Sequence, residues 1–136
     1  MSDKENASIG LHVQVNQPYE AALERVKAAL KAEGFGVLTE IDVKDTLKKK
    51  LGVDFQRYII LGACNPPLAH RALSANLDVG LLLPCNVVVY ETSADTSMAG
   101  LVDPMSMSDL FSSPTFEALA ADALERFKRV AAVLSA

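Results

Sequence analysis

The sequence predicts an α+β protein with two layers, in which a mixed or antiparallel sheet of about five strands is covered by helices. Short apolar segments of strand length alternate along the chain with segments whose apolar residues recur at helical spacing. Prolines, glycines and capping side chains separate these segments. The resulting order is β-α-β-(α)-β-α-β-β-α, and one sheet with helices on one face accommodates every apolar stripe.

The first predicted strand covers residues 9–15, where apolar and polar side chains alternate as in a half-buried strand. Asn16, followed by Pro18, predicts the start of a helix with a capping side chain and an early proline. Gly34 predicts the end of that helix. The helix has an apolar stripe made of Tyr19, Ala22, Leu23, Val26 and Leu30.

Residues 35–43 predict a second strand. Asp42 or Asp45 is expected to cap a short helix that contains Leu47 and Leu51 and ends at Gly52.

Residues 58–64 predict a third strand, expected in the centre of the sheet because neither face carries many polar side chains. Asn65-Pro66-Pro67 then predicts a helix start. The inner side of that helix is formed by Leu68, Ala69, Ala72 and Leu73.

A hairpin is predicted from residues 84–91 and 97–102, which flank the polar segment 92–96. Ser113-Pro114 is expected to cap a long final helix. The apolar stripe of this helix is Phe116, Leu119, Ala123, Phe127, Val130 and Leu134.

Length and composition indicate one domain. The chain has 136 residues, of which 50% are apolar and 22% charged, enough apolar material for a core. Residues 1–7 are interpreted as a flexible N-terminal arm and residues 8–136 as a single domain.

Composition also bears on compartment and partners. No apolar run approaches the roughly 20 residues of a membrane span, and the polar first residues are unlike a secretory signal. We therefore expect a cytoplasmic protein with reduced cysteines and no membrane partner. The net charge is −4, and Lys48-Lys49-Lys50 is the one basic run, typical of a solvated helix end. Nucleic acid is not expected as a partner.

Two cysteine segments are the strongest functional signal. Ala63-Cys64-Asn65-Pro66 ends a strand before a helix, and Leu83-Pro84-Cys85-Asn86 begins a strand. A thiol at a helix start favours thiolate, although Pro66 and the proline after it remove amide donors there. A buried, inert cysteine is the alternative for each position. If the two strands are neighbours, the thiols could approach each other.

Other chemistry is poorly supported. The sequence has no glycine-rich phosphate loop and no nucleophile elbow, and its carboxylates have no visible partner. His12 should face solvent. His70, on the second helix, lacks ligand spacing to the cysteines; it could reach over the Cys64 end or lie on the polar side of its helix. A complete zinc site is therefore not expected, while copper(I), which accepts two or three soft ligands, is less easily excluded.

The strings from Tyr58 to Pro66, from Leu82 to Tyr90 and at Asp103-Pro104, with Gly34 to Val43 upstream, resemble the DUF302 family. The resemblance extends from Ile9 to the last helix. The family name records a domain of unknown function, so the resemblance implies an α+β fold and a tendency to pair, but no reaction or cofactor.

Three functional readings stay open. The first is a homodimeric binding module for a small molecule or soft metal, with a site formed by Cys64, Asn65, Pro66, Cys85 and Asn86. The second is a redox protein or enzyme in which Cys64 is the nucleophile and Cys85 resolves it. The third keeps both cysteines purely structural. For the dimer contact, the sequence offers the apolar residues Met105, Met107, Phe111 and Phe116, if they are exposed.

Overall fold

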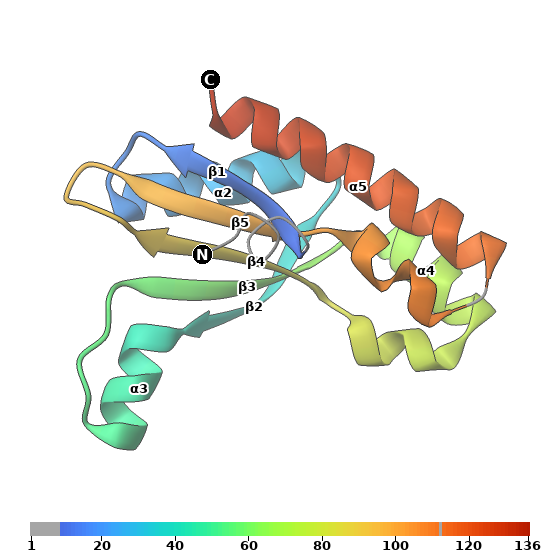
Figure 1. The fold of residues 1–136 in the computed structure, drawn as a ribbon, viewed down its shortest axis with the longest axis horizontal. Helices are drawn as coiled ribbons and strands as arrows, with labels where there is room; N and C mark the ends of the chain where they lie inside the picture. Colours follow the sequence, from blue (N-terminus) through green and yellow to red (C-terminus); the bar gives the residue numbers. More distant parts are fainter. Residues whose placement is uncertain (1–8, 112) are drawn as a thin grey trace.

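The computed structural model describes residues 9–111 and 113–136, so the predicted arm over residues 1–7 lies outside the described part. Five antiparallel strands form one sheet in the order β1-β5-β4-β3-β2 (Figure 1). The strands are β1 (Gly10–Val15), β2 (Gly36–Asp42), β3 (Tyr58–Cys64), β4 (Cys85–Glu91) and β5 (Ser97–Val102). The helices are α2 (Tyr19–Ala32), α3 (Val43–Leu51), α4 (Pro66–Ala75) and α5 (Pro114–Leu134). The predicted α+β class and element order are confirmed.

Two further elements were not predicted from the sequence. Short 3-10 helices, η1 (Leu77–Leu82) and η2 (Pro104–Leu110), follow α4 and β5. Neither segment is long enough to show a clear helical period, so local pattern does not reveal them.

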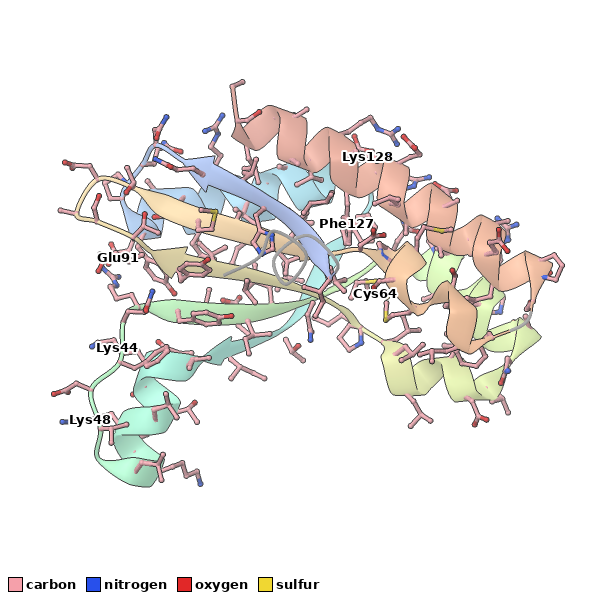
Figure 2. All side chains as sticks on the ribbon, in the orientation of Figure 1. Lys44, Lys48, Cys64, Glu91, Phe127 and Lys128 are labelled. Atoms are coloured by element: carbon pink, nitrogen blue, oxygen red, sulfur yellow. The ribbon has the colours of Figure 1, made fainter. Side chains whose placement is uncertain are left out.

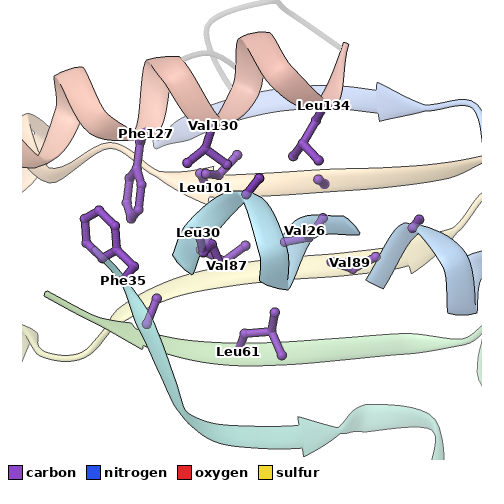
Figure 3. Packing of buried hydrophobic residues seen from close by; sticks show 14 of the residues in the cluster. Val26, Leu30, Phe35, Leu61, Val87, Val89, Leu101, Phe127, Val130 and Leu134 are labelled. Atoms are coloured by element: carbon purple, nitrogen blue, oxygen red, sulfur yellow. The ribbon is translucent and has the colours of Figure 1, made fainter. Parts of the chain in front are cut away.

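One face of the sheet packs against helices α2 and α5. Central rows of this face are Leu11, Leu101, Val87 and Leu61, and Val13, Ala99, Val89 and Ile59. Figure 3 shows Val26 and Leu30 of α2 and Phe127, Val130 and Leu134 of α5 against these strands. The rings of Phe35 and Phe127 meet with centroids 4.7 Å apart. Burial of these apolar side chains is the main source of stability.

The opposite face, which we call the open face, is defined by three cross-strand rows. They are Tyr58, Tyr90, Met98 and Gln14; Ile41, Ile60, Val88, Gly100 and His12; and Thr39, Gly62 and Asn86. Strand β3 is an interior strand, as its composition indicated, but the middle strand is β4.

Most predicted helix ends are confirmed. Asp42 caps α3 by accepting from the Asp45 amide, and Ser113 caps α5 by accepting from the Phe116 amide. Gly34 and Gly52 have positive φ angles of 85° and 69°, which favour glycine after a helix. The expected Asn16 cap is wrong: Pro18 occupies the N-cap of α2, and no side chain in the described part of the chain caps this helix.

A second, smaller core cluster lies beyond the end of the sheet. Ala72 of α4, Val79 of η1, and Phe116, Leu119 and Ala120 of α5 are buried together there. Met105 and Phe111 pack on this cluster, and the Phe111 and Phe116 rings lie 5.0 Å apart. The apolar concentration that we considered as a dimer contact therefore contributes to core packing.

Among the residues that the structure describes, no helix is both long enough and apolar enough to cross a membrane.

Candidate functional site

The two cysteine segments lie side by side at one end of the sheet. Strands β3 and β4 pair so that Ala63 is opposite Cys85, and β2 pairs with β3 so that Gly36 is opposite Cys64. The condition stated for an approach of the two thiols, that their strands be neighbours, is therefore met. Both cysteines are free thiols.

The pleat of the strands directs the two thiols differently. Ala63 and Cys85 lie on the helix-covered face, where Cys85 packs against the main core. Because successive residues of a strand point to opposite faces, Cys64 belongs to the other side of the sheet, with Gly62 (Cys64 is labelled in Figure 2). The register therefore assigns the two thiols to opposite faces of the sheet.

Burial controls the ionisation of Cys85. Desolvation, with a smaller contribution from the nearby Cys64, raises the pKa of the Cys85 thiol from its ordinary 9.0 to about 11. At neutral pH Cys85 is thus a protonated, weakly polar group, and a poor nucleophile.

Asn65 connects three helices around this end of the sheet. Its side chain, only 7% exposed, accepts from the Leu68 amide at 3.3 Å and caps α4. Its Nδ2 donates to the Glu33 carbonyl at the end of α2 at 3.5 Å, and Arg126 of α5 donates to the same carbonyl at 3.0 Å. Asn65 therefore fixes the position of α4 relative to α2 and α5.

Gly34 explains how closely these helices approach. A Cβ atom at this position would lie 2.9 Å from Asn65 Nδ2, and its φ of 85° is already unfavourable for other residues. Gly34, in the turn after α2, therefore packs closely against Asn65, the residue that caps α4.

A cavity of about 60 Å³ lies between the end of the sheet and the second core cluster. Cys85, Ala63 and Asn65 contribute to its wall from the cysteine segments. Its other lining residues are apolar and come from α4, α5, η1 and η2, with Phe35 and Leu83 from connecting segments. Those of the four helices include Ala69, Ala72, Val79, Met107, Phe116 and Leu119. The cavity is therefore an apolar space with one half-buried thiol and one buried amide at its edge.

The structure separates the five predicted site residues into two groups. Asn65 and Cys85 line the cavity, whereas Cys64, Pro66 and Asn86 are not part of its wall. Pro66 is exposed at the start of α4, and Asn86 is exposed on the open face. Sequence reasoning missed the lining residues of η1 and η2; the apolar concentration around Met107 and Phe116 was the available signal.

Metal ligation is limited by the same geometry. In the described part of the chain, no three histidine, cysteine, aspartate or glutamate side chains gather closely enough to hold a metal ion. His12 and His70 are both exposed, on the open face and on α4.

The fold and site define a two-layer α+β domain in which an apolar cavity adjoins the end of the sheet. The chain belongs to the DUF302 family, described as "Domain of unknown function DUF302", whose model matches residues 11–134. The crystal structure of an uncharacterised conserved DUF302 protein from Bacillus stearothermophilus is similar, with a TM-score of 0.82 and 35% sequence identity. The similarity covers 92% of this chain and 97% of that one. No curated protein matches the chain significantly.

Proposed function

We propose that this protein is a homodimeric binding module that takes a small apolar molecule, or the apolar part of a larger one, into the cavity beside Cys85. The observation that carries the proposal is the lining: sixteen residues surround the cavity, and all but Asn65 and Cys85 present hydrocarbon or thioether groups. Ligand sites typically combine such an apolar wall with a few placed polar groups.

The polar groups at the edge suit a neutral ligand. Cys85 is protonated at neutral pH, because burial raises its pKa to about 11. The amide oxygen of Asn65 already caps α4. Among the side chains that the structure describes, none that lines the cavity is charged, so a charged ligand would lose its hydration without compensation from them.

Size restricts the ligand further. The cavity measures about 60 Å³, smaller than an engineered apolar cavity of about 150 Å³ that binds benzene or xenon. A short alkyl group matches this space, and a larger molecule requires a side chain to move.

The redox alternative receives less support. A Cys64 nucleophile resolved by Cys85 needs both thiols in one space, yet the strand pleat assigns them to opposite faces. Binding of a soft metal is also poorly supported, because the two thiols lie on opposite faces and the described residues provide no third ligand beside them. A purely structural Cys85 is the outcome if the cavity binds nothing.

Titration with straight-chain alcohols from ethanol to n-hexanol, followed by amide chemical shifts, tests the proposal. We expect saturable shifts around Ala72, Cys85 and Leu119, which line the cavity. Ala69→Leu, which adds volume at the cavity wall, should weaken binding at least about 10-fold through lost space. Ala121→Leu, at an exposed position of α5, is the matched control and should bind as the wild type does.

Non-saturating shifts, or equal affinity in the Ala69→Leu and Ala121→Leu variants, would contradict binding at this cavity. Thermal unfolding of both variants shows whether either change disturbs the fold instead.

A further inference from the structure

The open face of the sheet is poor in charged side chains for a face exposed to water. An antiparallel sheet with one solvated face normally alternates apolar side chains inward and polar side chains outward. Here the three rows of the open face contain no aspartate, glutamate, lysine or arginine. The charged residues of the strands, Glu40, Asp42 and Glu91, belong instead to rows of the helix-covered face.

Apolar groups occupy the middle of the open face. Ile41, Ile60 and Val88 are direct cross-strand neighbours, and Ile41 is 48% exposed. Beside them the rings of Tyr58 and Tyr90 stack with centroids 5.3 Å apart. A continuous apolar patch of this kind on a protein surface marks an interaction site.

Helix α3 extends this surface. It projects from the β2 edge of the sheet, away from α2 and α5 (Figure 1), and none of its nine residues is buried. Val43, Leu47 and Leu51 recur four residues apart on one side, and Leu51 is 69% exposed. A helix this short is marginal in water and depends on packing of its apolar side, which its own chain provides only in part.

The loop after α3 joins the two parts. Lys44 of α3 donates to the Phe55 carbonyl at 2.8 Å, and the Phe55 ring contacts Tyr58 with centroids 6.2 Å apart. Phe55 is itself 40% exposed. The apolar side of α3, Phe55 and the open face therefore form one surface, flanked by the exposed lysines of α3.

We propose that this surface is where a second copy of the chain binds, with α3 of each copy against the open face of the other. The inference rests on the proposed homodimer and assigns its contact. In a twofold dimer the same patch meets itself, so like charges would face each other; the uncharged rows avoid this repulsion. A stable interface needs roughly 20–30 residues from each partner, and five strands with α3 provide a surface of that order.

The test compares charge substitutions by sedimentation equilibrium. Val88→Glu, at the middle of the central strand, and Leu51→Glu, at the exposed end of the apolar side of α3, should each raise the dimer dissociation constant about 30-fold or more. Leu81→Glu, at a leucine of η1 that is 85% exposed, is the matched control and should leave the dimer dissociation constant unchanged. Circular dichroism and thermal unfolding identify any variant that fails to fold, and Leu51→Glu is the safer of the two because it removes no buried contact.

The outcomes distinguish the homodimer itself from the surface assigned to its contact. Wild-type protein that remains monomeric at high concentration would overturn the homodimer and the contact together. A wild-type dimer that both Val88→Glu and Leu51→Glu leave intact would overturn the contact while the homodimer stands.

Discussion

At Cys85, burial and strand direction together set the chemistry of the residue. The side chain packs against the main core and lines the cavity, and desolvation holds its proton. Cys64 follows Ala63, the residue paired with Cys85, and belongs to the opposite face. Two residues that look equivalent in the sequence therefore have different surroundings.

Cys85 should resist alkylation. With its pKa at about 11 instead of 9.0, the thiolate fraction at pH 8 is about 100-fold lower than that of an ordinary cysteine. In a Cys64→Ser variant, iodoacetamide should therefore modify Cys85 about 100-fold more slowly in the folded protein than in urea. The rate should climb as the pH rises toward 11. Mass spectrometry measures both rates, and equal rates at pH 8 would refute the protonated thiol.

The same pKa affects stability at alkaline pH. Because the folded-state pKa is raised, the contribution of Cys85 to the free energy of unfolding is complete below about pH 9. It is lost as the pH rises from there toward about 11, where the folded protein also ionises.

At the scale of elements, helix ends depend on side chains that also make tertiary contacts. Asn65 caps α4 and reaches the carbonyl end of α2, while Arg126 of α5 joins the same carbonyl. By contrast, Asn76 caps η1 through the Asp78 amide at an exposed position and makes no such junction. Asn65 thus joins three helices that are distant in the sequence, whereas Asn76 joins only the consecutive elements α4 and η1.

Asn65→Ala should lower the free energy of unfolding by about 1–2 kcal/mol, through the lost cap and the lost buried hydrogen bond. Asn65→Asp keeps the cap acceptor but loses the amide donor, so its effect should be smaller. Urea denaturation measures both, with Asn76→Ala as the control. A larger loss for Asn76→Ala than for Asn65→Ala would argue against the junction.

At the scale of the whole molecule, α5 connects the two core clusters. Its first half contributes Phe116, Leu119 and Ala120 to the smaller cluster, and its second half contributes Phe127 and Val130 to the main one. Leu68 of α4 packs on both clusters. The cavity lies where they meet, so its shape depends on how α4 and α5 are held.

Phe127→Ala should lower the free energy of unfolding by about 3–5 kcal/mol, because a fully buried ring that packs on Phe35 is removed. Since α5 links the clusters, the far-ultraviolet circular dichroism and the tyrosine fluorescence of the variant should still change together in a urea titration. Val133→Ala, at a position of the same helix that is 53% exposed, is the control and should cost much less. Two separate transitions in the wild type would show that the clusters unfold independently.

The amino-acid sequence by itself determined the α+β class, the order of strands and helices, and the family. These follow from signals within a few residues: alternation in the strands, helical stripes in α2 and α5, and capping by Asp42, Asn65 and Ser113. Such signals act locally, so they can be recognised without knowing which segments pair. The Asn16 cap failed because Pro18, two residues later, takes the N-cap itself.

Only the tertiary structure decided which residues share a space. The register that sets Ala63 opposite Cys85 also directs Cys64 to the other face, since strand neighbours alternate. The cavity forms mainly from two pairs of consecutive elements, α4 with η1 and η2 with α5, which are distant from each other in the sequence and come together by burying apolar surface. Burial of this kind has no local pattern, and for that physical reason the site could be anticipated only at Asn65 and Cys85.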